Sequence, residues 1–242
     1  QELGRLDEAA ASYKQAIALK ADYTEAHNNL GNTLKELEKL DEAEASYNQA
    51  IAFKPNYVEA HYNLGIMLKE LGRLDEAEAS YNQAIVLKPD YAEAYYNLGN
   101  TLKELGRLDE AEASCRQAIV LKTDLAAAHM NLGITLNELG RLKEAEASYK
   151  QAIALKYDFA EAHSNLGNTL KELGRLDEAG ASYTQAIALK PNYAEAHNNL
   201  GSMLKELSRL DQAEASYRQA IALKPNFVEA YYNLGNTIKE LG

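Results

Sequence analysis

Seven asparagines recur at intervals of 34 residues, and their side chains are the ones best suited to repeated contact with a partner. An asparagine both donates and accepts hydrogen bonds, so it can pair with the N–H or C=O group of a peptide whatever side chains that peptide carries. Helices pack ~8 to 10 Å apart and an extended peptide advances ~3.3 Å per residue, so each asparagine would meet about every third peptide residue. The asparagines are Asn29, Asn63, Asn97, Asn131, Asn165, Asn199 and Asn233.

The residues beside these asparagines vary from copy to copy. The position just before each asparagine holds asparagine, tyrosine, methionine or serine, and a mostly polar column three residues further on is interrupted by Ile66 and Ile134. Varying side chains beside a constant one are expected to tune which partner is accepted. We therefore predict apolar pockets near Tyr62, Ile66, Tyr96, Met130 and Ile134.

Two charged columns accompany the asparagines. A glutamate stands four residues before the asparagine in every copy except at Ala127, so an acidic partner should be repelled. These glutamates are Glu25, Glu59, Glu93, Glu161, Glu195 and Glu229. A lysine column, exemplified by Lys35 and Lys69, is followed at each position by a glutamate, and such alternation is typical of a solvated face.

Other chemistry is not supported by the spacing. The five histidines occur at most once per copy, at ~10 Å separation, and cannot converge on an ion whose Zn–N distance is ~2.0 to 2.1 Å. Paired acids such as Asp41 and Glu42 recur at expected helix starts, which indicates capping rather than acid catalysis. No phosphate-cradling glycine loop and no nucleophile–base pair occurs in the sequence. The sequence therefore predicts no catalytic, cofactor-binding or metal site and no enzymatic activity.

Charge and hydropathy restrict the partners. The 242 residues include 36 acidic and 25 basic side chains, for a net charge of -11. Nucleic acids and anionic membranes are therefore disfavoured, because both are normally bound through basic surfaces. No apolar run approaches the ~18 residues of a spanning helix, so we expect a cytoplasmic location. The chain starts at Gln1 in the middle of a copy, so we also expect a longer protein whose flanks could carry a targeting signal.

Two helices per copy must position these side chains. Apolar residues at Ala26, Leu30, Leu34 and Leu37 form one stripe of a first helix. Gly31 lies inside that stripe and recurs in all seven copies, although a mid-helix glycine costs ~1 kcal/mol relative to alanine. Its recurrence predicts that a neighbouring helix crosses closely there.

The second helix is predicted to start at Asp41. Glu44 follows three residues later, as in an acidic relative of the capping box, and Lys54-Pro55 ends the unit. Thr123 and Tyr157 replace the corner proline, and Lys143 replaces the capping acid of the copy between them, so we expect weaker helix ends between about 121 and 158. Cys115 occupies a column that otherwise holds tyrosine, and is expected to be a buried, smaller substitute.

These patterns together resemble the tetratricopeptide repeat over the entire chain. The resemblance rests on A-x-N-L-G near Gly31, the E-L-G-R-L-D-E-A turn, and the tyrosine, alanine and Lys-Pro corner of the second helix. Histidine or tyrosine replaces the tryptophan common early in the family's first helix. The implied fold is all-α, a right-handed superhelical solenoid of antiparallel helix pairs with about 14 helices.

The resemblance predicts one solenoid domain over residues 1–242. It would comprise a lone second helix in 1–23 and a lone first helix in 228–242. Between them lie six full repeats: 24–57, 58–91, 92–125, 126–159, 160–193 and 194–227. First helices of this family line a concave groove, so the asparagines and the five apolar residues beside them are the predicted peptide-binding residues.

Several functions remain open at this point. The first is a scaffold module that grips a protein or extended peptide, because the asparagine column is similar to the ladder in the repeat region of O-linked N-acetylglucosamine transferases. The second is the substrate-recruiting part of a larger glycosyltransferase-like enzyme. The third is a self-associating scaffold or an engineered, consensus-like array. Self-association has a rationale, because the unmatched helices at the two ends leave complementary apolar stripes that could dock head to tail.

Overall fold

The computed structural model describes residues 2–242, with side chains from Gly4 onward. This part of the chain contains fourteen α-helices and no strand, as predicted. The helices are α1 (Glu2–Leu19), α2 (Thr24–Glu36), α3 (Leu40–Phe53), α4 (Val58–Glu70), α5 (Leu74–Leu87), α6 (Ala92–Glu104), α7 (Leu108–Leu121), α8 (Ala126–Glu138), α9 (Leu142–Leu155), α10 (Ala160–Glu172), α11 (Leu176–Leu189), α12 (Ala194–Glu206), α13 (Leu210–Leu223) and α14 (Val228–Leu241).

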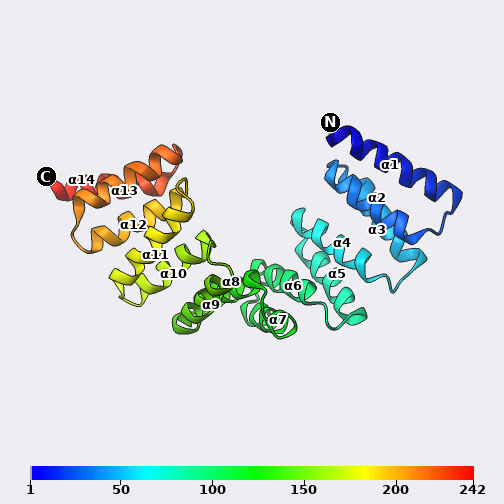
Figure 1. Ribbon diagram of the computed structural model, residues 1–242, viewed down its shortest axis with the longest axis horizontal. Coiled ribbons are helices and arrows are strands. Elements are labelled where there is room, and N and C mark those ends of the chain that lie inside the picture. The colour runs from blue at the N-terminus through cyan, green and yellow to red at the C-terminus, as the bar shows by residue number, and fades with distance from the viewer. Residues whose placement is uncertain (1) are drawn as a thin grey trace. The chain divides into compact units, whose positions relative to one another are not determined.

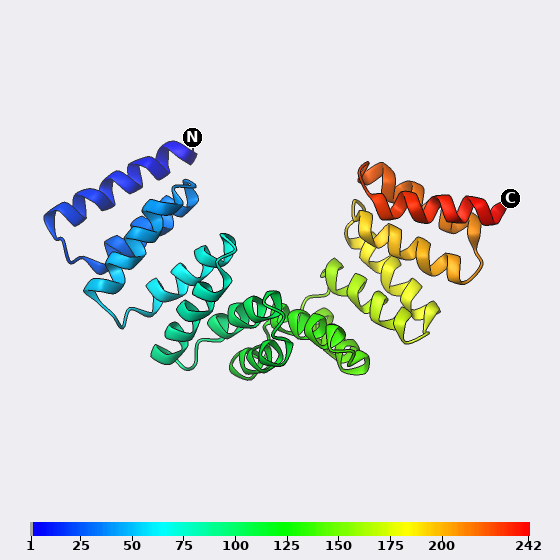
Figure 2. The ribbon, with the colours of Figure 1, turned by 180° about the vertical axis from the view of Figure 1, so that it is seen from behind.

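The contacts divide the chain into two compact units, Gln1–Thr123 with α1 to α7 and Asp124–Gly242 with α8 to α14. Residue 1, at which the predicted domain starts, lies outside the described residues. Within each unit, consecutive helices form antiparallel hairpins (Figure 1), and Figure 2 shows the same succession from behind. Even-numbered helices are the predicted first helices and odd-numbered ones the second.

On five of the second helices, a tyrosine packs onto the recurring glycine of the first helix in the same repeat. A Cβ added to Gly31 would lie 2.6 Å from Cε1 of Tyr47, and one added to Gly167 would lie 2.6 Å from Cε1 of Tyr183. Both tyrosines are fully buried. Such separations are far below van der Waals contact, so only glycine allows the ring to lie on the helix backbone. The predicted close crossing is therefore confirmed.

Cys115 takes the tyrosine's place opposite Gly99. A Cβ at Gly99 would lie 2.8 Å from Cys115 Sγ and 3.2 Å from the Ala111 carbonyl oxygen, so α6 and α7 approach each other closely around the smaller side chain. Cys115 is 0% exposed, which confirms the prediction of a buried substitute. Burial raises the pKa of its thiol to about 12, so the sulfur stays protonated and unreactive at neutral pH.

The predicted capping box is wrong. Helix α3 begins at Leu40, its N-cap is Lys39, and no side chain makes a cap hydrogen bond there. Asp41 and Glu42 instead lie in the first turn, where acids interact favourably with the helix dipole. The same arrangement holds at α9, which begins at Leu142, so Lys143 removes no cap. The expected weakness of 121–158 then rests on the missing prolines alone and stays a prediction.

Glu44 ties one repeat to the next instead of capping its own helix. Arg73 Nη1 donates to Glu44 Oε2 at 2.6 Å, while Arg73 Nη2 donates to Glu76 Oε2 at 2.6 Å. Arg107 and Arg175 form equivalent clamps in the later copies. The clamp explains why arginine follows the turn glycine.

The turn between the two helices of a repeat closes the first helix through a left-handed residue. In one copy the Gly72 N–H donates to the Lys69 carbonyl and the Arg73 N–H to the Leu68 carbonyl, the pattern of a Schellman motif. Gly72 has φ 74°, whereas Glu38 and Ser208 occupy the same position with φ 58° and 56°. Those two residues adopt a conformation that favours glycine.

Replacing both residues by glycine should stabilise the chain. An L-residue in the left-handed conformation costs roughly 1 to 2 kcal/mol, which glycine avoids. Glycine also gives the unfolded chain more conformational freedom, and this cancels roughly 0.4 to 1 kcal/mol of the stabilisation. We therefore expect Glu38→Gly and Ser208→Gly each to raise the free energy of unfolding by about 0.5 to 1 kcal/mol, measured by urea denaturation. Glu38→Ala is the control that keeps the strain; equal stability of both Glu38 variants would contradict the argument.

The corner between repeats is held by the lysine that precedes the proline. Lys88 Nζ lies 4.6 Å from the centroid of the Tyr91 ring, and Lys190 Nζ lies 4.7 Å from that of Tyr193. Histidines of the first helices bond to carbonyl groups of the same corner, as His27 Nε2 does to Ala21 at 2.8 Å. Their polar atoms serve the fold, and the described residues include no group of three His, Cys, Asp or Glu that could hold a metal. Among residues 2–242, no helix is both long and apolar enough to cross a bilayer.

Candidate functional site

The asparagine column connects consecutive first helices. Asn63 Nδ2 donates to Asn28 Oδ1 at 3.0 Å, and Asn97 Nδ2 donates to the Tyr62 hydroxyl at 2.9 Å. Asn233 makes the same contact with Asn198 at 3.2 Å. The acceptor comes from the variable position that precedes the asparagine of the previous repeat. The amide nitrogens are thus used within the protein.

The amide oxygens remain available as acceptors. In the described residues, Oδ1 of Asn63, Asn97, Asn165 and Asn233 accepts no hydrogen bond, and these side chains are half-buried. Asn29 is exposed and its Oδ1 has only a long contact of 3.4 Å with Asn28. Because the nitrogen side of Asn63, Asn97, Asn165 and Asn233 is held, these four members of the column present oriented oxygens.

Two members of the column depart from this pattern. Asn199 Nδ2 donates to Asn168 Oδ1 at 3.0 Å instead of to the variable position. Asn131 is buried, and its Nδ2 has no hydrogen-bond partner in the described part of the chain. Asn131 is therefore the predicted ladder residue least accessible to a peptide.

The variable positions act first as packing between repeats. The Tyr62 ring lies 4.7 Å from the Tyr91 ring and its hydroxyl accepts from Asn97. Met130 is buried, with its sulfur 3.9 Å from Asn165 Nδ2. Tyr96 and Ile66 are half-buried. Ile134 is the predicted selectivity residue that lines a hollow of the described surface.

The acidic column is partly neutralised. Glu93, Glu161 and Glu195 each accept from the corner lysine of their own repeat at 2.9 Å. These hydrogen bonds hold the pKa of all three carboxyls below the usual range. The repulsion of acidic partners by this column is therefore smaller than the sequence alone implies.

The lysine column forms cross-repeat ion pairs rather than a solvated face. Lys35 Nζ lies 3.1 Å from Glu70 Oε1, and Lys69 Nζ lies 2.8 Å from Glu104 Oε1. Lys171–Glu206 and Lys205–Glu240 are the equivalent pairs in the second unit. The lysine side chains are only 22 to 28% exposed. We call these pairs the Lys–Glu rungs.

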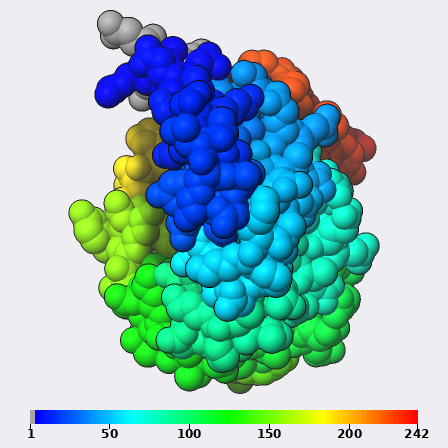
Figure 3. All heavy atoms as spheres, turned by 90° about the vertical axis from the view of Figure 1, so that its right-hand side faces the viewer, coloured from blue at the N-terminus to red at the C-terminus, as the bar shows by residue number. Residues whose placement is uncertain are grey.

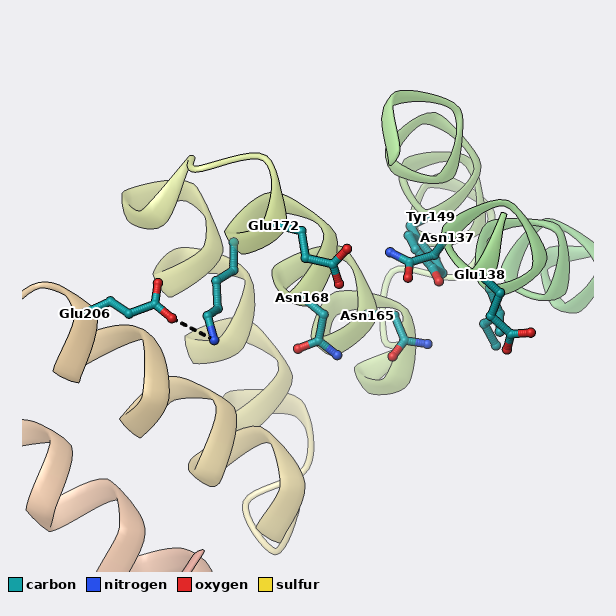
Figure 4. A pocket seen from close by; sticks show the side chains of 9 residues that line it. Asn137, Glu138, Tyr149, Asn165, Asn168, Glu172 and Glu206 are labelled. Atoms are coloured by element: carbon teal, nitrogen blue, oxygen red, sulfur yellow. Dashed lines mark ion pairs between the residues drawn. The ribbon is translucent and has the colours of Figure 1, made fainter. Parts of the chain in front are cut away.

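A hollow of about 540 Å³ lies on the first helices of the second unit. Figure 4 shows Asn165, Asn168 and Glu172 of α10 facing it, with Asn137 and Glu138 of α8 opposite. Ile134, Tyr149, Lys171 and Glu206 complete its lining. Its size is within the ~300 to 1,000 Å³ of ligand pockets. The hollow joins ladder asparagines to charged groups.

Sequence reasoning predicted Ile134 and Asn165 of this hollow but missed its charged part. Glu172 and Glu206 follow lysines of the column that was predicted to form a solvated face, and Tyr149 was not predicted to line a site. The available signal was Asn137, the one exception in the lysine column. The exception could be interpreted only from the structure, which shows that the other lysines pair with a glutamate of the next repeat.

Sequence comparison covers most of the chain with one family. The profile described as TPR repeat matches residues 2–38, 31–72, 66–106, 135–174, 167–208 and 201–242. The profile described as tetratricopeptide repeat matches residues 92–123. Comparison with curated proteins gives no match.

Solved structures of the same fold include three informative neighbours. PilW, described as a widely conserved type IV pilus biogenesis factor, gives a TM-score of 0.79 at 25% identity, covering 87% of this chain and 98% of PilW. YrrB, described as a TPR protein with an unusual peptide-binding site, gives 0.63 at 25% identity, covering 77% and 96%. A chain of the APC/C hetero-tetramer Cut9-Hcn1 gives 0.78 at 18% identity, covering 97% of this chain and 46% of that one.

The last neighbour shows the fold alone, and this chain spans less than half of its length. The repeated helix pairs, the glycine–tyrosine crossings and the profile matches agree with one another from the first described helix to the last. The chain belongs to the tetratricopeptide repeat family.

Proposed function

We propose that the chain binds an extended peptide along its first helices, with the asparagine column as a ladder of acceptors. The observation that carries the proposal is that Asn63, Asn97 and Asn233 each have a free Oδ1 atom while their Nδ2 atom is held by the preceding repeat. An amide fixed by one hydrogen bond loses little further freedom when it forms a second, which favours binding. Backbone N–H groups of the peptide are the donors that fit, so binding would tolerate many peptide sequences.

Relatives of the chain support this class of function. YrrB is described as a TPR protein with an unusual peptide-binding site, and the family generally binds proteins or peptides. The predicted resemblance of the asparagine column to the ladder of O-linked N-acetylglucosamine transferases is part of the same proposal. It also keeps the second candidate, a recruiting module of a larger glycosyltransferase-like enzyme, as an alternative. A cytoplasmic location, a lack of activity in this chain and a lack of affinity for nucleic acid belong to the proposal too.

The ladder is tested by removing its oxygens. Asn29→Ala, Asn63→Ala and Asn97→Ala combined should weaken binding to a library of capped nonapeptides about 100-fold, from roughly 1 kcal/mol per lost hydrogen bond. Binding is measured by fluorescence polarisation and folding by circular dichroism. Asn48→Ala with Asn82→Ala is the control, because both asparagines are exposed on second helices. Unchanged affinity in the folded triple variant would refute the ladder.

A specific observation also favours head-to-tail self-association as a second candidate. A Cβ added at Gly235 of α14 would meet nothing within 4 Å, whereas at Gly201 it would lie 2.8 Å from Tyr217. The tyrosine that would cover Gly235 has its counterpart in Tyr13 of α1, which is half-buried. Figure 3 shows α1, in the darkest blue, at the molecular surface beside the lighter α2 and α3. One copy's α1 could therefore pack on another copy's α14.

Gly235→Ala separates this association from folding. The added methyl group would exclude an incoming tyrosine, as a methyl group at the other glycines would. The site on α14 is open, so the same change leaves the monomer undisturbed. We expect wild type to associate with rising concentration in sedimentation velocity and Gly235→Ala to stay monomeric. Identical sedimentation of the two proteins would remove the proposed contact.

A further inference from the structure

The Lys–Glu rungs are interrupted at one place within the second unit. Asn137 occupies the lysine position of its repeat and donates through Nδ2 to the Thr169 hydroxyl at 3.0 Å. Glu172, which would receive that lysine, forms no ion pair with any described residue. Lys171 lies in the same hollow, but Glu206 Oε1 and the Ser202 hydroxyl hold its ammonium at 2.9 and 3.2 Å. Figure 4 shows this pair as the dashed contact and Glu172 apart from it.

The hydroxyl of a tyrosine that lines the hollow is unpartnered as well. The equivalent tyrosines Tyr47 and Tyr183 donate to Asn32 and Asn168 at 2.7 and 2.8 Å. Tyr149 faces Ile134 in place of that asparagine, and no hydrogen bond joins its hydroxyl to any of residues 2–242. Tyr149 is only 2% exposed and lines the hollow. Burial, then the charges of Glu138 and Glu172, raise the pKa of Tyr149, so both carboxylates act on it and the phenol stays neutral.

The chemistry of the hollow is therefore complementary to one kind of side chain. Its lining has three carboxylates and one cation, and that cation is already paired. Ile134 supplies an apolar wall for an aliphatic stem, the carboxylates accept charged N–H groups, and the Tyr149 oxygen accepts one more. Both long basic side chains carry these features, but arginine has five donors in a fixed plane against three on lysine, so it can satisfy several of these acceptors at once.

We propose that this hollow is a selective pocket for an arginine side chain of the bound peptide. The inference rests on the proposed peptide function, because the ladder residue Asn165 lines the same hollow. A peptide gripped by its backbone at the ladder would be placed in register by the arginine. The selectivity would arise because Asn137 stands where other repeats have a lysine, which leaves Glu172 unpaired.

The first unit contains an equivalent site in which the lysine is present. Ile66 and Tyr81 repeat the pair Ile134 and Tyr149, but Lys69 is present and closes its rung on Glu104 at 2.8 Å. The two sites differ in the lysine that neutralises the glutamate. Exchanging lysine and asparagine between them should move the pocket.

The test uses Nα-acetyl-arginine N-methylamide as probe and the citrulline analogue as its uncharged isostere. Binding is followed through the side-chain amide signals of Asn137, Asn165 and Asn168 in NMR spectra of the full chain. We expect the arginine probe to bind about tenfold more tightly than the citrulline probe, equal to about 1.4 kcal/mol. Glu172→Gln and Asn137→Lys should each remove that preference. Lys69→Asn should create a second saturable site, reported by the Asn63 and Asn97 amides.

Gain of the second site guards against variants that merely fail to fold. Equal binding of the two probes to wild type, or an unchanged preference in Asn137→Lys, overturns the pocket. If peptides bind through the ladder but show no arginine preference, the pocket fails and the proposed function stands. If the arginine probe binds but no library peptide does, the proposed function fails while the pocket stands.

Discussion

Tyr183→Ala is expected to lower the free energy of unfolding by about 3 to 5 kcal/mol, the range found when a buried aromatic ring is truncated in a core. The ring is 0% exposed and fills the space over Gly167. Its loss opens a cavity that the two helix backbones cannot close, because further packing holds them. Urea denaturation followed at 222 nm measures the effect. A loss below about 1 kcal/mol would show that the helices collapse onto the gap.

Two phenylalanine variants separate the ring from its hydroxyl. Tyr183→Phe removes the hydrogen bond to Asn168 and should cost about 1 kcal/mol. Tyr149→Phe removes a hydroxyl that has no partner among residues 2–242, so its unfolding midpoint should stay close to wild type. Equal losses in the two variants would show that the hydroxyl of Tyr149 is used in the free protein.

Gly167→Ala should destabilise the chain even though alanine is the better helix former. Adding a methyl group to a filled core costs roughly 1 to 3 kcal/mol. The higher helix propensity of alanine compared with glycine offsets about 1 kcal/mol of that cost. The added Cβ would lie 2.6 Å from the buried Tyr183 ring, so the overlap term prevails. So close an overlap belongs to the upper part of that range, about 2 to 3 kcal/mol, and the net loss is expected to be about 1 to 2 kcal/mol.

Gly235→Ala should stabilise the chain, although Gly235 belongs to the same glycine column as Gly167. Nothing lies within 4 Å of the added Cβ, so only the propensity gain remains and the melting temperature of the monomer should rise. Calorimetry at a concentration below any association compares the two variants. A rise for both would mean that the tyrosine rings shift freely, contrary to the packing described for Tyr183.

Much of the fold followed from the period of the sequence. The apolar stripe at Ala26, Leu30 and Leu34 predicted the first helix, and the recurring Gly31 predicted the close crossing that Tyr47 makes. The helix starts were predicted less well. An acid after a turn suggested a cap, but the Schellman turn and the Arg73 clamp already occupy that junction, so the acids serve the helix dipole and the next repeat.

The candidate site was only half predictable. The asparagine column is visible in the sequence, but which amide atom stays free depends on the residue 35 positions earlier, in another repeat. Likewise, the exception at Asn137 has no evident meaning in the sequence. The Lys69–Glu104 ion pair shows that a lysine at that position would neutralise Glu172. Pairings between repeats decide the chemistry of the surface, and a sequence pattern within one repeat does not specify them.

The same pairings have a consequence for how such a chain can change length. Within each unit, the helix contacts link only adjacent helices and successive first helices. A whole copy inserted in phase would therefore find every packing surface, arginine clamp and Lys–Glu rung already complementary, and its removal would let the flanking copies rejoin. Duplication of a unit is structurally permitted at almost any junction. A later exchange of one lysine for asparagine would then be enough to give a new copy its own preference.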